Sequence, residues 1–165
     1  MKQRNLQKEI LELLEAEALT ERQDLALRLG ISEEELEREI HRLEEEQVIL
    51  GYGARVNWDQ MEDQRVTALI EVNITPQRDL GFDDLARRLY SFREVSDCYL
   101  MSGAYDLMVI VHGPSLLSVA RFVSEKIAPI DAVLSTRTHF ILKKYKMDGQ
   151  ILEPAPSDDR ELWSL

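Results

Sequence analysis

The sequence predicts an α+β chain of two domains, a helical one followed by one that mixes strands with helices. Two observations support this. Leucines recur at helical spacing among many glutamates up to about residue 60. Beyond that point, β-branched runs alternate with helical stretches. We therefore expect one domain over residues 1–60, a second over 61–146 and a C-terminal tail over 147–165.

Composition limits the classes of function. The 165 residues include 20 basic and 31 acidic side chains, a net charge of −11, which argues against nucleic-acid binding driven by charge alone. The single cysteine, Cys98, excludes an internal disulfide and fits a reducing compartment. The longest apolar run, Leu107–Val111, is too short to cross a membrane, and the N-terminus lacks the apolar stretch of a signal peptide. We expect a cytoplasmic protein with no membrane partner.

Three helices are expected in the first domain. In the second of them, Thr20 and Gln23 form a capping-box pattern at the start of Glu21–Leu29. Gly30 then ends this helix in a left-handed turn that glycine adopts at little cost. The first helix presents an apolar face made of Leu6, Ile10, Leu13 and Leu14.

The third helix and the segment after it complete the domain. Ser32 and Glu35 form another capping-box pattern, and two short apolar stretches, 48–50 and 54–58, flank a glycine-rich turn at 51–53. The order helix, helix, tight turn, helix, hairpin is typical of a winged helix-turn-helix. The buried stripe of the third helix is expected to be Leu36, Ile40 and Leu43.

The second domain is expected to run strand, helix, strand, strand, helix, strand. The alternation of apolar and polar residues predicts a half-buried first strand over Thr67–Ile74, which Pro76 ends. Ser115, just after Gly113-Pro114, is the expected cap of the second helix. The other strands are predicted over Val95–Met101, Leu107–Val111 and Ala132–Leu142, with the first helix around Phe82–Leu89.

This order gives an antiparallel sheet with both helices on one face, the ferredoxin-like arrangement. The other face would carry either Val72 and Ile74 or Leu69 and Glu71, depending on the register. We expect a second sheet to cover it, and self-association is the simplest source of that sheet. The tail ends in the apolar pair Leu162-Trp163, which either docks on the other subunit or remains mobile.

Three stretches carry a resemblance to a known family. Residues 25–57, LALRLGISEEELEREIHRLEEEQVILGYGARVN, resemble the helix-turn-helix and wing of the leucine-responsive regulatory protein/AsnC (Lrp/AsnC) transcription factors. Residues 102–111 (SGAYDLMVIV) and 133–143 (VLSTRTHFILK) resemble the effector domain of that family, known as the RAM domain. Two positions depart from the family's usual pattern. Gln47 stands where glycine is usual, and Ala104 stands where an acidic residue is usual.

The resemblance covers about residues 5–146 and implies a function. It implies a regulator of amino-acid metabolism that binds double-stranded DNA and needs no cofactor. It also implies a homodimer that pairs through its sheets, often assembled further into tetramers or octamers. A small effector, commonly an amino acid, is expected to bind between dimers.

The third helix is the expected DNA-reading element, although it is rich in glutamate. At about 100° per residue, the side opposite its buried stripe centres on Arg38, His41 and Arg42. Arginine reads guanine through two hydrogen bonds, worth about 1–3 kcal/mol of discrimination. Glu34 lies at the end of this face, and Arg22 and Arg55 are expected to contact phosphates. The predicted DNA-binding residues are therefore Arg38, His41, Arg42, Glu34, Arg22 and Arg55.

The same helix also fits a solvated, charge-laced surface. Glu34–Arg38, His41–Glu45 and Arg42–Glu46 are i,i+4 neighbours, and such pairs stabilise a helix by about 0.2–0.5 kcal/mol. A second hypothesis is therefore an effector-sensing or assembly module in which DNA binding is weakened or lost. A third is an enzyme similar to the sirohaem decarboxylases, which share the two-module architecture. Their aromatic- and Arg-rich stretch after the second strand is not matched at residues 99–105.

The effector site is expected at the turn between the middle strands. Tyr105 and Asp106 offer a hydroxyl and a carboxylate, and a carboxylate suits an α-ammonium group. Thr136 and Thr138 share one face of the last strand. The resemblance assigns the effector pocket to these four residues and Gly103. Taken without it, the residue types indicate an ordinary hairpin turn and two ordinary strand residues.

No pattern predicts a metal, cofactor or catalytic site. His41, His112 and His139 are too scattered for metal-ligand spacing. The glycines at 51–53 lack the third glycine and the following helix of a dinucleotide site.

Overall fold

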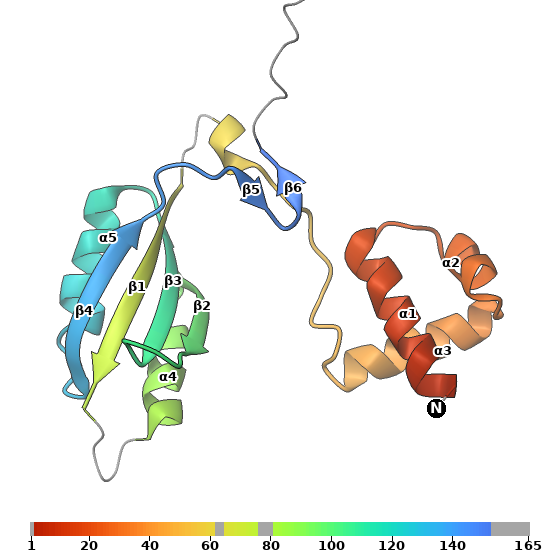
Figure 1. The fold of residues 1–165 in the computed structure, drawn as a ribbon, viewed down its shortest axis with the longest axis horizontal. Helices are drawn as coiled ribbons and strands as arrows, with labels where there is room; N and C mark the ends of the chain where they lie inside the picture. Colours follow the sequence, from red (N-terminus) through yellow and green to blue (C-terminus); the bar gives the residue numbers. More distant parts are fainter. Residues whose placement is uncertain (1, 62–64, 76–80, 153–165) are drawn as a thin grey trace, which may run out of the picture. The chain divides into compact units, whose positions relative to one another are not determined.

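The computed structural model describes residues 2–61, 65–75 and 81–152. The chain forms two compact units, Met1–Arg55 and Val56–Leu165. The first contains three helices and the second a sheet with helices on one face (Figure 1). Within the described residues, no helix is long and apolar enough to cross a membrane.

The first unit is built from α1 (Lys2–Ala16), α2 (Arg22–Leu29) and α3 (Glu33–Glu45). The predicted stripe on α3 is confirmed, because Leu36, Ile40 and Leu43 are each at most 2% exposed. Burial of a side chain of this size contributes about 1.5–3 kcal/mol. These residues share one core with side chains from the other two helices, Ile10, Leu14, Leu25 and Ala26.

The helix ends of this unit agree with the sequence at two of three positions. Gly30 ends α2 in the left-handed conformation, with φ of 66°. The Ser32 hydroxyl caps α3 by accepting a hydrogen bond from the Glu35 N–H at 3.2 Å. The predicted cap at Thr20 is wrong. Its hydroxyl donates backward to the Glu17 carbonyl at 3.0 Å, and Glu21 takes the N-cap position without a side-chain hydrogen bond.

The chain leaves α3 through a left-handed residue. Gln47 has φ of 56°, and the N–H groups of Val48 and Ile49 both donate to the Leu43 carbonyl, at 2.9 and 3.0 Å. A non-glycine residue pays about 1–2 kcal/mol for this conformation. Gln47 therefore occupies a position whose backbone favours glycine, which explains why glycine is the usual residue there.

The two short wing strands expected at 48–50 and 54–58 are not formed. Residues 50–57 form neither helix nor strand, and the short 3-10 helix η1 (Trp58–Gln60) follows them (Figure 1). Side chains from this segment bind the helices instead of pairing strand to strand. The Tyr52 hydroxyl donates to Glu44 of α3 at 2.8 Å, and the Arg55 guanidinium donates to the Glu15 carbonyl of α1 at 2.7 Å.

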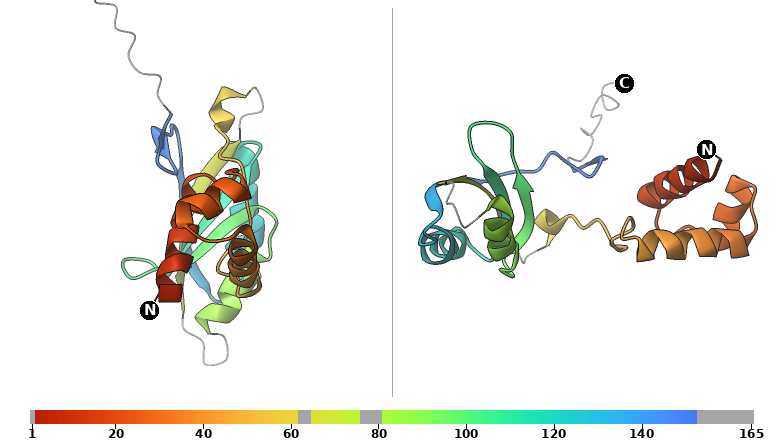
Figure 2. Two further views of the ribbon diagram at one scale, coloured as in Figure 1. Left: turned by 90° about the vertical axis from the view of Figure 1, so that its right-hand side faces the viewer. Right: turned by 90° about the horizontal axis from the view of Figure 1, so that it is seen from below.

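The second unit confirms the ferredoxin-like prediction. Its sheet has the order β2-β3-β1-β4, and every adjacent pair is antiparallel. The helices lie on one face of this sheet, as two further views show (Figure 2). The elements are β1 (Val66–Ile74), α4 (Phe82–Tyr90), β2 (Val95–Leu100), β3 (Leu107–Gly113), α5 (Leu116–Phe122) and β4 (Val133–Phe140).

The register settles which residues face the helices. Ile70 and Val72 of β1 are fully buried and pack with Leu85 and Leu89 of α4. Leu69 and Glu71, which alternate with them, therefore lie on the open face. Met108 and Ile110 of β3 and Tyr99 of β2 pair across the sheet onto that same face.

Two features of this unit were not expected. Helix α5 begins at Ser115 with the predicted cap, in a reciprocal capping box with Ser118, but it continues as a π-helical turn, η2 (Val123–Ile127). A small hairpin of β5 (Lys146–Met147) and β6 (Gln150–Ile151) follows β4, so the predicted tail begins with paired strands. Leu162-Trp163 lies outside the described residues.

Candidate DNA-binding and effector sites

The outer face of α3 carries the residues that the sequence assigned to it. Arg38, His41 and Arg42 are all exposed, on the side away from the core. Arg42 donates to Glu46 at 2.7 Å, and this hydrogen bond raises the pKa of its guanidinium further. His41 lies 3.2 Å from Glu45. No hydrogen bond or ion pair joins Arg38 to another of the described residues. Arg38 can therefore bind an anion without first breaking a contact with a carboxylate.

The predicted phosphate contacts are engaged with the unit's own groups. Arg22 at the start of α2 lies 3.0 Å from Glu37 of α3 and also interacts with Tyr52. Burial, followed by the hydrogen bond to Glu44, raises the pKa of Tyr52. Arg55 is held at the C-terminal end of α1 by the Glu15 carbonyl. Glu34 is exposed in the first turn of α3, where the helix dipole favours acidic side chains.

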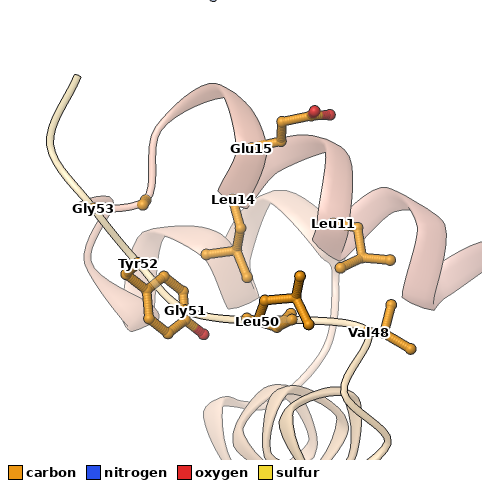
Figure 3. A pocket seen from close by; sticks show the side chains of 10 residues that line it. Leu11, Leu14, Glu15, Val48, Leu50, Gly51, Tyr52 and Gly53 are labelled. Atoms are coloured by element: carbon orange, nitrogen blue, oxygen red, sulfur yellow. The ribbon is translucent and has the colours of Figure 1, made fainter. Parts of the chain in front are cut away.

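Tyr52 is a site feature that the sequence did not reveal. It lies in a groove of about 500 Å³ beside α1, lined also by Leu11, Leu14, Val48 and Leu50 (Figure 3). By joining Glu44 and Arg22, it links α3 to the start of α2. The sequence showed only an aromatic residue between two glycines, which we interpreted as a hairpin turn.

In the second unit, Asp106 is part of the turn itself. Its carboxylate accepts a hydrogen bond from the Ile74 N–H at 2.8 Å, and its own N–H donates to the Val72 carbonyl at 3.1 Å. Asp106 thereby fastens the turn before β3 to the end of β1. The side chains of Tyr105 and Asp106 are half-buried, whereas Gly103 is exposed with open space around its Cα.

The two threonines lie across β1 from this turn. Thr136 pairs with Val72 and Thr138 with Ile70, so both project to the helix-covered side at the edge of the sheet, where they are half-buried. Val72 also pairs with Leu107, the residue after Asp106. The sheet therefore brings Asp106 and Thr136 to the same end, on opposite sides of β1, and places Thr138 one pair further along.

Comparisons with known proteins fit this architecture. Residues 67–151 match the family model described as the Lrp/AsnC ligand binding domain. An uncharacterized HTH-type transcriptional regulator, YugG of Bacillus subtilis, is 45% identical over 161 residues, 97% of each chain. The chain belongs to the Lrp/AsnC family.

Two further matches extend the picture of this Lrp/AsnC protein. The HTH-type transcriptional regulator LrpA of Pyrococcus horikoshii is 32% identical over 137 residues, covering 83% of this chain and 94% of that one. The structure of a feast or famine regulatory protein from M. tuberculosis, complexed with L-methionine, has a TM-score of 0.71 at 25% identity. It covers 90% of this chain and 98% of its own. The protein is thus a transcriptional regulator of this family, and the enzyme hypothesis finds no support among its relatives.

Proposed function

We propose that this protein binds specific double-stranded DNA through α3 and that an amino acid modulates the binding. The observation that carries the proposal is the position of Arg38, exposed near the middle of the outer face of α3 and not paired with another described residue. His41 and Arg42 flank it, and each can exchange an exposed carboxylate for DNA at little cost, because surface ion pairs contribute only about 0–1 kcal/mol. Glu34 would accept from a cytosine amino group.

Affinity should depend weakly on salt. Among the described cations of the first unit, Lys8, Arg22 and Arg42 lie against carboxylates, and the slope of binding against salt follows the number of phosphates neutralised. Arg22 and Arg55 contribute to this number only if DNA displaces their present partners.

The test is an electrophoretic shift assay with the region upstream of the protein's own gene, at low salt. Arg38→Gln should weaken specific binding by about 1–3 kcal/mol, which is about 5- to 150-fold. The matched control is Arg88→Gln, an exposed arginine of α4 in the other unit, which should bind normally. If the wild-type protein retards no DNA at micromolar concentration, the second hypothesis, a module with DNA binding lost, replaces this one.

The effector proposal rests on the turn at 103–106 and the threonine pair, together with the L-methionine complex of the M. tuberculosis relative. We assign the site to Gly103, Tyr105, Asp106, Thr136 and Thr138. A thermal shift screen of the twenty amino acids tests it, with Thr136→Val as the variant and Thr20→Val in the first unit as the control. A flat response to all twenty would refute the assignment.

We also propose a homodimer through the open face of the sheet, with assembly to tetramers or octamers. Leu69, Met108 and Ile110 supply apolar surface there, and Glu71 is only 18% exposed, paired with Arg137 and His139. Ile110→Lys should therefore yield monomers in light scattering, and an unchanged dimer would exclude this face. As a regulator of transcription, the protein would act in the cytoplasm.

A further inference from the structure

A cavity of about 370 Å³ in the second unit concentrates positive charge in an otherwise acidic chain. It lies where β1 begins and the chain leaves β4, beside η1, all at one end of the sheet (Figure 1). Its volume falls within the range of about 300–1,000 Å³ typical of small-molecule sites. Among the described residues, the polar part of its wall includes Asp59, Arg65, Thr67, Lys143 and Lys144.

Among the described residues of this wall, three cations face a single acid. Lys144 lies 3.5 Å from Asp59, and its side chain is only 21% exposed. Arg65 lies over the ring of Trp58, 4.0 Å from its centroid, and the ammonium group of Lys143 lies 4.6 Å from the centroid of Tyr145. These contacts hold long side chains in place, which reduces the entropy that a ligand must otherwise remove on binding.

The positive charges of this cavity also affect the pKa of the neighbouring His112. The pKa of His112 is lowered mainly by burial, and then by the positive charges of Lys144 and Arg65. Asp97 acts in the opposite direction without reversing the shift. Clefts lined by one sign of charge concentrate ions of the other sign, even on a protein whose net charge repels them.

We propose that this cavity binds a phosphate group. Lysine and arginine are the side chains that bind phosphate, through charge-assisted hydrogen bonds. Leu116 and Ile141 line the rest of the cavity and suit the organic part of a phosphorylated small molecule. The site is distinct from the proposed effector turn and does not depend on how α3 reads DNA.

Trp58 provides a direct readout, because Arg65 lies against its ring. The other tryptophan, Trp163, is replaced by phenylalanine so that Trp58 is the only indole. The full chain is titrated with inorganic phosphate and then with pyrophosphate, at constant ionic strength against sodium chloride. We expect a saturable change in Trp58 fluorescence, and pyrophosphate should bind more tightly because it carries more charge.

Three variants separate a built site from general charge effects. Lys144→Gln should weaken phosphate binding about tenfold, since it removes one charge-assisted hydrogen bond. Asp59→Asn should strengthen phosphate binding several-fold, since it removes the one acid among the described residues of the cavity wall. The matched control is Lys126→Gln, an exposed lysine in η2, which should leave the affinity unchanged.

A phosphate of the DNA backbone has the same chemistry as a free phosphate, so a 20-base-pair duplex forms the second arm of the experiment. If Lys144→Gln weakens duplex binding while Lys126→Gln does not, and free phosphate gives no signal, the phosphate belongs to DNA. If neither free phosphates nor the duplex distinguishes the two lysine variants, the proposal is overturned.

Discussion

The two units use their charged side chains differently. On α3, charged partners such as Arg42 and Glu46 are both about half exposed, so their ion pair adds little stability. In the second unit, the half-buried carboxylate of Asp106 joins two strand ends, and the carboxylate of Glu71 contacts both Arg137 and His139. The comparison indicates that charges on α3 are available for exchange with a ligand, whereas several of those around the sheet are fixed because the fold depends on them.

The largest loss of stability should come from removing the carboxylate of Asp106. Asp106→Ala removes the acceptor of the half-buried Ile74 N–H, and an orphaned buried donor costs about 1–3 kcal/mol. Urea unfolding of the second unit should show this loss. Asp106→Asn, which keeps an acceptor oxygen, should lose much less. Equal stability of the alanine variant and the wild type would show that Asp106 is as exchangeable as the charges on α3.

Removing one partner of an exposed ion pair on α3 should change DNA binding and leave stability almost unaltered. Glu46→Gln frees Arg42 and removes a negative charge from α3, the proposed DNA-binding helix, so it should strengthen DNA binding several-fold while changing stability by no more than about 0.5 kcal/mol. Fluorescence anisotropy with labelled duplex measures the first quantity and thermal unfolding the second. Glu125→Gln in the second unit is the matched control. A fall in affinity would contradict the role of Arg42.

A backbone change in the first unit should produce a gain. Gln47→Gly relieves the left-handed strain at φ of 56°, and after the entropy cost of glycine we expect about 0.5–1 kcal/mol of added stability. Differential scanning calorimetry should show a higher melting temperature. Gln47→Ala, which keeps the Cβ, should not reproduce the gain; if it does, the side chain rather than the backbone is responsible.

The smallest effect should be the contribution of His112 to the pH dependence of stability in the second unit. The pKa of His112 in the folded state is below its ordinary value of 6.5, mainly because of burial. The unfolded chain therefore binds more protons as the pH falls through about 6.5, so this contribution to stability is full above that pH and is lost below it. Urea midpoints between pH 7.5 and 5.5 should fall less steeply in His112→Gln than in the wild type.

The sequence predicted the helices and strands well because their periodicity reflects burial directly. The stripe of α3 and the alternation along β1 lie where they were expected. The predictions of the wing strands and of the Thr20 cap were wrong. In each case the residues form other hydrogen bonds, and the sequence alone does not show which hydrogen bond is preferred. Tyr52 and Arg55 found partners on the helices, and the Thr20 hydroxyl found the carbonyl of Glu17.

The candidate sites were predictable to different degrees. Outward positions on α3 follow from helical geometry alone, so Arg38 could be placed from the sequence. The partners of Arg22 and the role of Asp106 in fastening β1 depend on contacts between elements far apart in the chain. The same is true of the cationic cavity, because Arg65 and Lys144 are brought together only by the pairing of β1 with β4.

Because of the π turn at its end, α5 should tolerate the deletion of one residue, whereas α4 should not. A π turn holds one residue more than an α-helical turn over the same length, as the Ala128 N–H bound to the Val123 carbonyl shows. Deleting one residue there would restore ordinary helical geometry and leave the flanking side chains in phase. The same deletion in α4 would rotate Leu85 relative to Leu89 by about 100° and withdraw one of them from the core. Insertions and deletions among homologues should therefore gather at η2.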